Sequence, residues 1–387
     1  MRRMEPLPAL LLSVVLVLTL LPVRSVVAAP DDAAIPDITG KFKSAAVMDA
    51  RTGEFLMGHA MHRRLPPASM VKMMTELIVL EQIAEGEIAP QETVTVSAKA
   101  SRMGGSQVYL KQGERFPVVE LLEALAIQSA NDAAVALAEH VAGSTEAFVE
   151  MMNARAAELG MRDTEFHSPH GLPPGRGQQP DLSSAHDMAL LGRQICRFPE
   201  ALHWAVSNRV PFRGGKFLLT NPNPLVGKLK GLEGIKTGFH SRAGYCLTAA
   251  CRRKGVRLIS VVMGCPTNRD RGVETTRLLA RGFGLYTKVT LVPAAGDSVG
   301  AVPVRGGKPS RVTVTAAAPL VVGVRKALLD SLRLTLHVQD DLAPPLPAGQ
   351  PVGFAVARLD GAALDSVAVR TATPVKKAGF WDRLLGR

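Results

Sequence analysis

ASMVKMMTEL, residues 68–77, places a serine and a lysine three positions apart on a predicted helix. Residues at i and i+3 share one face of a helix, so we expect the side chains of Ser69 and Lys72 to meet. Pro66 and Pro67 precede the pair, as is typical of the chain at the start of a helix. A serine hydroxyl is a weak nucleophile until a base removes its proton. A lysine can be that base when burial or a second cation lowers its pKa.

Taken alone, Ser-x-x-Lys is a weak signal, because a serine at a helix N-terminus followed by a solvated lysine has the same spacing. Two further stretches strengthen it. Ser129-Ala130-Asn131 falls near a predicted helix end, and Lys236-Thr237-Gly238 falls on a predicted strand. Each of the three patterns occurs once in the chain, in this order. The ordered trio is known from penicillin-binding proteins and class A β-lactamases, in which the first serine is the nucleophile.

The periodicity of apolar residues predicts an α+β domain between residues 30 and 290. Strands are expected within 41–60, and helical patterns follow in the middle of the domain. Alternation with period two then predicts three successive strands, GIKTGF, YCLTAACR and VRLISVVMGC. Strands at both ends of the domain suit an antiparallel sheet that joins them, with a cluster of helices between. The expected helices lie within 69–85, 118–143, 145–160 and 183–197.

Residues 291–372 have a different character. They are rich in Val, Ala, Gly and Pro, and short alternating runs such as RVTVTA and LRLTLHV replace the helical pattern. We predict a small, separate, all-β domain here. Residues 373–387 form a short tail with apolar residues on one predicted helical face and basic residues beside them. The apolar positions are Phe380, Trp381, Leu384 and Leu385. Such a tail is typical of a weak interfacial membrane anchor, or of a packed or frayed chain end.

The first 29 residues resemble a secretory signal peptide. Arg2 and Arg3 precede the apolar stretch LPALLLSVVLVLTLLPV, and small residues follow in RSVVAAP. An uncleaved membrane anchor is the alternative. In either case the sequence predicts an exported protein that works outside the cytoplasm, at the outer face of the cytoplasmic membrane.

The composition narrows the class of partner. The chain has 387 residues and a formal net charge of +12, which suits an anionic polymer or membrane surface. Aromatic residues make up only 4%, and no run of five or more Lys or Arg occurs, so nucleic acid is not expected. The four cysteines fit no zinc-binding spacing, and we expect neither a metal nor a cofactor. Cys246 and Cys265 fall on neighbouring predicted strands. We expect either a cross-strand disulfide between them or two buried free thiols.

With these motifs, the chain resembles the D-alanyl-D-alanine carboxypeptidases of the penicillin-binding protein 5 type over nearly its whole length. Further stretches resemble that family, namely residues 104–144, HGL at 170–172, HDMALLGR and RLISVVMG. The resemblance implies a penicillin-binding, β-lactamase-like transpeptidase domain followed by the family's β-rich domain. It also implies a substrate, the peptidoglycan stem peptide that ends in D-Ala-D-Ala, and inhibition by β-lactam antibiotics.

The resemblance also implies roles for individual residues. Ser69 would attack the carbonyl between the two D-alanines, Lys72 would activate it, and Ser129 and Lys236 would relay the proton to the leaving D-alanine. Asn131, Thr237 and Gly238 would line the substrate. The backbone N–H groups of Ser69 and Phe239 would form the oxyanion hole. Arg271 would bind the terminal carboxylate.

Three rival functions share these parts. A β-lactamase would need a fast deacylating base, and no glutamate in a loop like that of class A enzymes is evident. An endopeptidase would cut cross-links between stem peptides. A non-catalytic penicillin-like sensor or scaffold would keep the cleft without turnover, and the intact Ser69, Lys72 and Lys236 argue against it.

Overall fold

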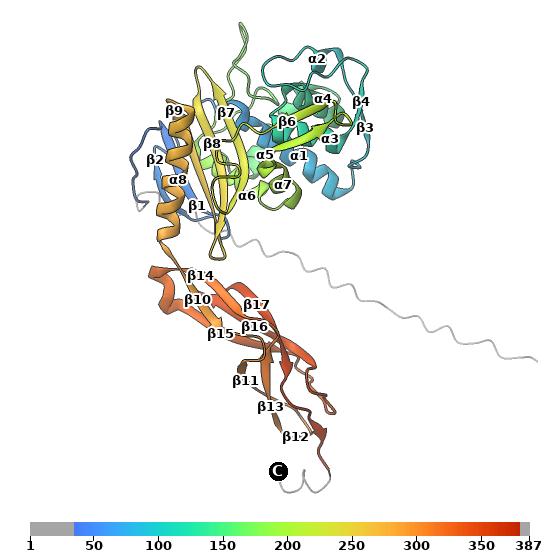
Figure 1. Ribbon diagram of the computed structural model, residues 1–387, viewed down its shortest axis with the longest axis vertical. Coiled ribbons are helices and arrows are strands. Elements are labelled where there is room, and N and C mark those ends of the chain that lie inside the picture. Colours follow the sequence, from blue (N-terminus) through green and yellow to red (C-terminus); the bar gives the residue numbers. More distant parts are fainter. Residues whose placement is uncertain (1–34, 380–387) are drawn as a thin grey trace, which may run out of the picture. The chain divides into compact units, whose positions relative to one another are not determined.

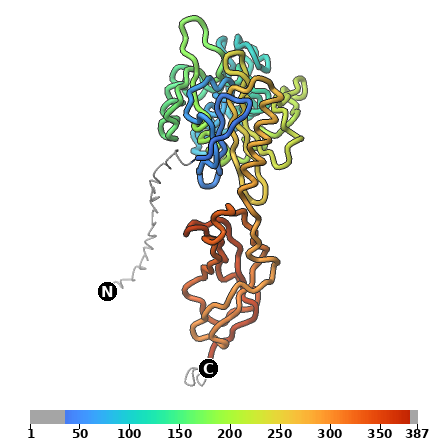
Figure 2. The backbone as a smooth tube through the Cα atoms, turned by 90° about the vertical axis from the view of Figure 1, so that its left-hand side faces the viewer, coloured from blue at the N-terminus to red at the C-terminus, as the bar shows by residue number. Residues whose placement is uncertain are grey.

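A five-stranded antiparallel sheet organises the first domain in the computed structural model, which describes residues 35–379 (Figure 1). The strand order is β2-β1-β9-β8-β7. Strands from both ends of the domain therefore lie side by side, with Val47 of β1 opposite Ser260 of β9. Figure 2 shows this pairing as blue chain beside gold. The strands are β1 (Ser44–Asp49), β2 (Phe55–His59), β7 (Leu232–His240), β8 (Gly244–Arg253) and β9 (Val256–Cys265).

The two faces of this sheet bury two apolar cores, because neighbouring residues of a strand point to opposite sides. Along β1, Ala46 and Met48 join the larger core with the helical cluster, whereas Ala45 and Val47 join a smaller core. Helix α8 (Asn268–Gly284) covers the smaller core. The alternating runs of the sequence thus become the central layer of an α+β domain, as predicted.

The helical cluster fills the middle of the domain. It starts with the 3-10 helix η2 (Ala68–Val71), which continues directly into α1 (Lys72–Glu85). A π-helix, η3 (Ala124–Gln128), joins α3 to α4. The other helices are α2 (Ala98–Ser101), α3 (Val118–Glu123), α4 (Asn131–Ala142), α5 (Thr145–Glu158), α6 (Ala185–Ile195) and α7 (Pro199–Val206). Two small hairpins accompany them, β3 (Thr93–Thr95) with β4 (Arg115–Pro117), and β5 (Arg209–Phe212) with β6 (Phe217–Thr220).

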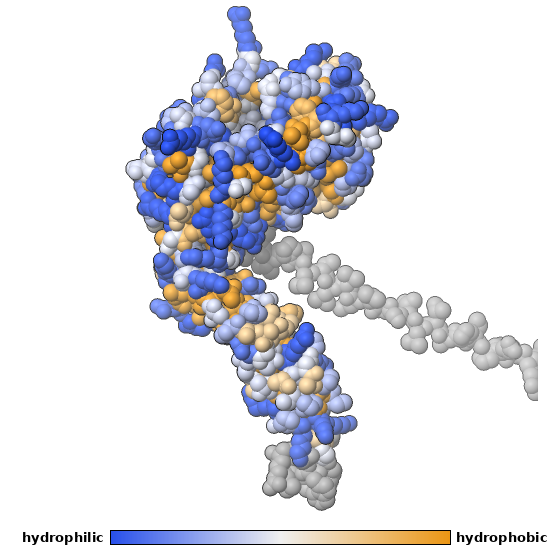
Figure 3. All heavy atoms as spheres, viewed as in Figure 1, coloured by the Kyte–Doolittle hydropathy of each residue, from blue (hydrophilic) through white to orange (hydrophobic). Residues whose placement is uncertain are grey.

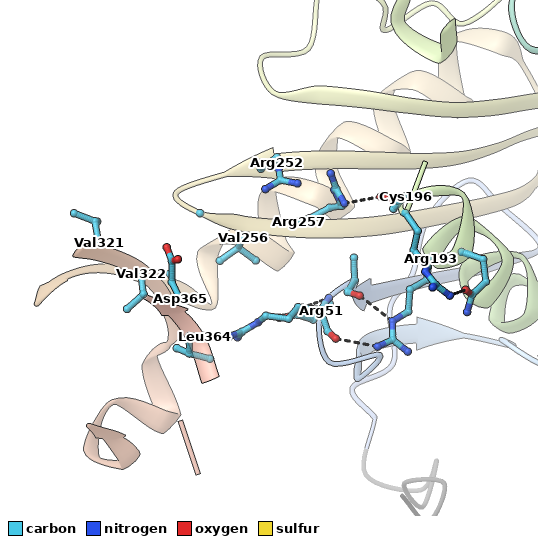
Figure 4. Close-up of a pocket in the computed structure, with 16 residues that line it drawn as sticks. Arg51, Arg193, Cys196, Arg252, Val256, Arg257, Val321, Val322, Leu364 and Asp365 are labelled. Carbon is cyan, nitrogen blue, oxygen red and sulfur yellow. Dashed lines mark hydrogen bonds between the residues drawn. The ribbon is translucent and has the colours of Figure 1, made fainter. Parts of the chain in front are cut away.

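Helix α6 is fixed to the sheet by arginines as well as by its apolar face. Arg193 donates hydrogen bonds to the carbonyl oxygens of Ala50, at 2.8 Å, and Arg51, at 2.9 Å, in the turn between β1 and β2. Arg257 of β9 donates to the carbonyl oxygen of Cys196 at 3.0 Å, just after the helix. Figure 4 shows both ties. These bonds supply donors to carbonyl oxygens of the turn and of the chain just after the helix, and they attach the C-terminal end of α6 to the sheet.

The C-terminal domain is all-β. Its main sheet has the order β11-β13-β17-β16-β15, and its core is built mostly from valine, leucine and alanine. The first strand, β10, begins at Tyr286, a few residues before the start expected from the sequence. The elements are β10 (Tyr286–Val292), β11 (Ser298–Pro303), β12 (Gly307–Lys308), β13 (Arg311–Ala316), β14 (Leu320–Arg325), η4 (Lys326–Ser331), β15 (Leu332–Val338), β16 (Pro351–Leu359), β17 (Ala362–Thr371) and β18 (Lys376–Lys377).

The beginning of the expected tail belongs to this β domain. Lys376 and Lys377 form β18, which pairs with Lys308 and Gly307 of β12. The signal peptide predicted for residues 1–29 and the apolar tail residues from 380 onward lie outside the described residues. None of the helices within 35–379 has the length and hydrophobicity that a membrane crossing requires.

The surface of the first domain is mostly hydrophilic, and the cysteines lie in the interior. On the face drawn in Figure 3, hydrophilic side chains cover most of the first domain, and apolar patches lie between them. All four cysteines are buried free thiols, so the structure favours this alternative over a disulfide between Cys246 and Cys265.

Candidate active site

The predicted nucleophile and base meet at the junction of η2 and α1. Lys72, the first residue of α1, is fully buried, and its Nζ donates hydrogen bonds to Ser69 Oγ at 3.2 Å and to the His170 carbonyl oxygen at 2.7 Å. Ser69 itself is half-buried, whereas its partner Lys72 is fully buried. A lysine held in this way has lost its water shell and points at a single hydroxyl.

The surroundings of Lys72 favour its neutral form. Burial lowers its pKa well below the ordinary value, and the nearby positive charge of Lys236 lowers it further. Asp181 and Asp132 oppose this shift more weakly. A neutral amine can accept the proton of Ser69, whereas an ammonium ion cannot. These surroundings are those that a lysine acting as a general base requires.

Backbone strain shapes the segment that presents Ser69. Ala68 has a φ of +52°, which is uncommon for a residue with a side chain. Gly171 packs directly against it, and a Cβ there would lie 2.0 Å from the Ala68 carbonyl oxygen. Only glycine allows the His-Gly-Leu loop to approach this closely. Asp181 holds the same loop, because its carboxylate accepts hydrogen bonds from the backbone N–H groups of His167 and Ser168.

The second predicted stretch borders the same site. Ser129 ends the π-helix η3 in a left-handed conformation, with a φ of +62°. Its Oγ is buried and has no hydrogen-bond partner among residues 35–379. Asn131 begins α4 and donates from Nδ2 to the Gly104 carbonyl oxygen at 2.7 Å. Its Oδ1 is also buried without a partner within that described range. Unpaired buried polar atoms are costly, so both oxygens call for a partner that residues 35–379 do not supply.

The third stretch lies on β7, at the edge of the sheet. Lys236 and Thr237 are buried, whereas the side chain of Phe239 is 53% exposed and stacks on Tyr245 with 4.1 Å between ring centroids. Gly238 brings this strand against η2, since a Cβ on it would lie 2.4 Å from the Pro67 carbonyl oxygen. The close approach places β7 beside η2, the 3-10 helix that contains Ser69.

Lys236 has a buried acidic neighbour that the sequence analysis did not single out. Glu76 follows Lys72 by four residues on α1 and is buried, and its Oε1 has no hydrogen-bond partner in the part of the chain that the structure describes. Burial raises the pKa of Glu76, and burial lowers the pKa of Lys236, while each charge opposes the other's shift. The sequence signal for Glu76 was an acidic residue on the apolar face of the predicted helix that carries Ser69 and Lys72.

Arg271 reaches under the sheet from α8. Its guanidinium donates to the carbonyl oxygens of Gly238 at 3.5 Å and Cys246 at 3.3 Å, and to Asn268 Oδ1 at 2.6 Å. The side chain is buried, and burial lowers its pKa to about 10. In this structure Arg271 therefore supports the end of the Lys-Thr-Gly strand.

Direct contacts bring together Ser69, Lys72, the His-Gly-Leu loop and β7. The stretch with Ser129 and Asn131 joins them less directly. Its neighbour Asp132 acts on the charge of Lys72, and Asn131 and Leu172 both flank Gly105. His170 and Asp181 contribute to the site through a carbonyl oxygen and through the loop's backbone. Sequence reasoning missed these two roles because they depend on loop geometry.

Comparisons with known proteins match both domains of the chain. Residues 30–267 match the D-alanyl-D-alanine carboxypeptidase family, and residues 286–377 match the C-terminal domain of penicillin-binding protein 5. The D-alanyl-D-alanine carboxypeptidase DacF of Bacillus subtilis (strain 168) is 34% identical over 381 residues, which are 97% of this chain and 96% of that protein.

The chain belongs to the D-alanyl-D-alanine carboxypeptidase family. It is a serine-type carboxypeptidase, a hydrolase of the kind predicted from the three motifs. Its α+β peptidase domain and its all-β second domain are confirmed by the same comparisons.

Solved structures place the carboxypeptidase in the same fold. Penicillin-binding protein 5 from Haemophilus influenzae superposes with a TM-score of 0.62 at 31% identity, over 88% of this chain and 99% of that one. Penicillin-binding protein D2 from Listeria monocytogenes, in an ampicillin-bound form, gives 0.58 at 32% identity, over 64% of this chain and 99% of that one.

We expect Gly238→Ala to slow the release of D-alanine by the carboxypeptidase at least about tenfold, because a misplacement of roughly 1 Å can cost about a hundredfold in rate. The added methyl group would force β7 and η2 apart. Gly272→Ala in α8 is the matched control, since its Cβ would have no neighbour closer than 3.5 Å. Turnover of a D-Ala-D-Ala peptide measures both. Equal rates in the two variants would show that the close approach of β7 is not needed.

Proposed function

We propose that the carboxypeptidase removes the terminal D-alanine from peptidoglycan pentapeptide stems through an acyl-enzyme on Ser69. The observation that carries this proposal is the buried amine of Lys72, 3.2 Å from Ser69 Oγ, with a pKa lowered by burial and by Lys236. A nucleophile within hydrogen-bond reach of a base is the arrangement that covalent catalysis requires.

The acylation step follows from this geometry. Neutral Lys72 takes the proton of Ser69, and Ser69 Oγ attacks the carbonyl carbon between the two D-alanines. The backbone N–H groups of Ser69 and Phe239 stabilise the oxygen that becomes negative. The C–N bond then breaks, and the leaving amine receives the proton from Lys72, relayed by Ser129 and Lys236. Water hydrolyses the ester, which releases the shortened stem and restores Ser69.

The substrate backbone has a natural place along β7. This strand is the last in the order β2-β1-β9-β8-β7, so its outer side has no strand partner in the described part of the chain. An extended peptide can add to such an edge through main-chain hydrogen bonds. Thr237 and Gly238 would pair with the substrate on one side, and Asn131, whose Oδ1 has no partner among residues 35–379, would hold it from the other. Arg271 would attract the terminal carboxylate from below the strand.

We propose that β-lactam antibiotics inhibit the carboxypeptidase by acylating the same serine. Support comes from the ampicillin-bound form of the Listeria protein D2, which shares the fold. A strained β-lactam amide opens onto Ser69 as the D-Ala-D-Ala amide does, but the ring keeps its leaving nitrogen tethered in the site.

We place the enzyme outside the cytoplasmic membrane, exported by residues 1–29 and held weakly at the membrane surface by its C-terminal tail. The peptidoglycan substrate supports the extracytoplasmic location. The tail offers Phe380, Trp381, Leu384 and Leu385 as insertion residues, and the +12 net charge favours anionic lipid.

Benzylpenicillin should leave one adduct per protein, located on Ser69. Ser69→Ala should lose both this adduct and carboxypeptidase activity on diacetyl-Lys-D-Ala-D-Ala. Ser366→Ala, an exposed serine of β17, should keep both. Intact-mass and peptide-mapping mass spectrometry measure the adduct. A label on another serine, or activity in Ser69→Ala, would refute the assignment.

Activity should rise with pH as Lys72 loses its proton, at a pH below the ordinary lysine value of about 10.4. The sign follows because only neutral Lys72 accepts a proton, and its pKa is lowered. Lys72→Arg keeps the charge but cannot deprotonate in this range, so acylation should fall by roughly 100- to 10,000-fold and lose this rise. Lys288→Arg, at an exposed position of β10, is the control. A normal pH profile in Lys72→Arg would place the base elsewhere.

Removing residues 380–387 should reduce sedimentation with anionic liposomes and leave turnover of soluble peptides unchanged. The deletion starts at 380 because Lys376 and Lys377 pair with β12. The loss should be clearest at moderate salt, where screening weakens the attraction of the basic protein body. Binding of full-length and shortened proteins is compared at two salt concentrations. Identical binding would rule out the tail as an anchor.

A further inference from the structure

Three side chains from distant parts of the chain meet beside the first turn of helix α6. His62 follows β2, Asp163 follows α5, and His186 is the second residue of α6. One potential ligand atom from each, an imidazole nitrogen or a carboxylate oxygen, lies within 4.8 Å of the others. The two imidazole rings have centroids 4.5 Å apart. This cluster takes no part in the peptidase chemistry described above.

A buried carboxylate holds two members of the cluster. His186 donates from Nδ1 to Asp187 Oδ1 at 2.9 Å, which leaves the lone pair of the ring on Nε2. The other oxygen, Asp187 Oδ2, accepts from the Asp163 backbone N–H and from Thr164 Oγ1, both at 2.8 Å. Metal-binding histidines typically donate their other ring N–H to such a carboxylate, which fixes their orientation. Phe55 stacks on the His186 ring at 4.5 Å and limits its rotation further.

The third member can adjust to a ligand. His62 Nδ1 lies 2.7 Å from Asp163 Oδ2, and the side chain of His62 is 46% exposed. Zinc binds nitrogen and oxygen at about 2.0–2.2 Å in tetrahedral geometry, so two ligands around it lie roughly 3.3 Å apart. To hold a cation in place of the proton that they share, His62 Nδ1 and Asp163 Oδ2 need to move only about half an ångström further apart. An exposed side chain can make this change without moving the core.

We propose that His62, Asp163 and His186 bind a divalent transition metal ion of the Zn²⁺ type, with water at the fourth position. Two imidazoles and one carboxylate suit zinc, whereas calcium and magnesium prefer oxygen ligands. The expectation of a metal-free protein rested on cysteine spacing, and this cluster contains no cysteine. Its members are 101 and 23 residues apart along the chain (163 − 62 and 186 − 163), so no spacing motif could reveal it.

The ion would connect the segment before the nucleophile to the helical cluster. His62 precedes Ser69 by seven residues, and between them Leu65 exchanges two backbone hydrogen bonds with Ser183, just before α6. A metal that binds the folded site stabilises the folded protein, because the three ligands are not assembled in the unfolded chain. Since the ion displaces protons from its ligands, its affinity falls as the pH is lowered.

The chain supplies a matched control in the same strand region. His59 Nδ1 lies 3.0 Å from Asp37 Oδ1, an exposed histidine–aspartate pair like that of His62 and Asp163. His59 belongs to no group of three possible metal ligands among residues 35–379. Substitution of His59 therefore removes a comparable histidine–aspartate contact without touching the proposed site.

Untagged protein, treated with a chelator and then freed of it, is titrated with Zn²⁺ by calorimetry and with Co²⁺ by visible absorption. The parent and His59→Ala should bind one equivalent of Zn²⁺, and both should melt at a higher temperature when it is present. His62→Ala and His186→Gln should each weaken Zn²⁺ binding by more than about 100-fold. This loss is larger than the roughly 10- to 100-fold loss of affinity that follows when a residue that only hydrogen-bonds to a metal ligand is removed. The melting shift should disappear in both variants.

Two results of the Zn²⁺ titration would overturn the proposal. One is a parent protein without saturable binding of one Zn²⁺ equivalent, and the other is unchanged Zn²⁺ affinity in His62→Ala. His62→Ala decides the question if His186→Gln fails to fold, because His62 is exposed and its loss leaves the buried Asp187 contacts in place. Cobalt spectra of the octahedral type that do not differ between the parent and His62→Ala would equally count against the site.

Discussion

The peptidase domain depends on the burial of one amine. Lys72 lies at the start of a core helix, has no exposed surface, and makes its contacts with a hydroxyl and a loop carbonyl. A charged ammonium in this position would be strongly disfavoured by desolvation, so the fold itself favours the neutral base. The surrounding elements can be understood as the walls that keep water from this nitrogen: η2 with Ala68, the His-Gly-Leu loop, and β7 at Gly238.

The segments that keep water from Lys72 adopt unusual backbone conformations. Ala68 and Ser129 both adopt positive φ angles, and a π-helix precedes Ser129. Residues held in sparsely populated conformations cost of order 1–3 kcal/mol each and tend to occur at functional sites. The oxygens of Ser129 and Asn131, which have no partner in the described part of the chain, add to this cost. The domain tolerates both because its two apolar cores, on either side of the sheet, supply the stability that the site gives up.

The sequence predicted the parts of this protein whose chemistry is local. The spacing of Ser69 and Lys72, the alternation in β8 and β9, and the change of character near residue 290 all follow from helix or strand period. Contacts that depend on loop conformation could not be found in this way. The His170 carbonyl that receives the Lys72 hydrogen bond and the cluster of His62 with His186 depend on how distant segments fold together. Glu76 was visible as an acidic residue on an apolar helix face, but only its burial beside Lys236 reveals its electrostatic effect.

In the proposed binding mode, strand β7 stays open on its outer side to receive a peptide, and an open strand edge can also pair with another copy of the same chain. Barrels avoid this problem by closing, and other sheets cover the edge, but neither solution is compatible with a substrate that binds as a strand. The strong positive charge of the chain offers a different protection, since molecules that all carry about the same excess charge repel one another before their edges meet. High ionic strength screens this repulsion. The open edge that admits the substrate is thus also the place where two copies could pair. Conditions that screen the charge, such as high salt, therefore favour self-association through β7.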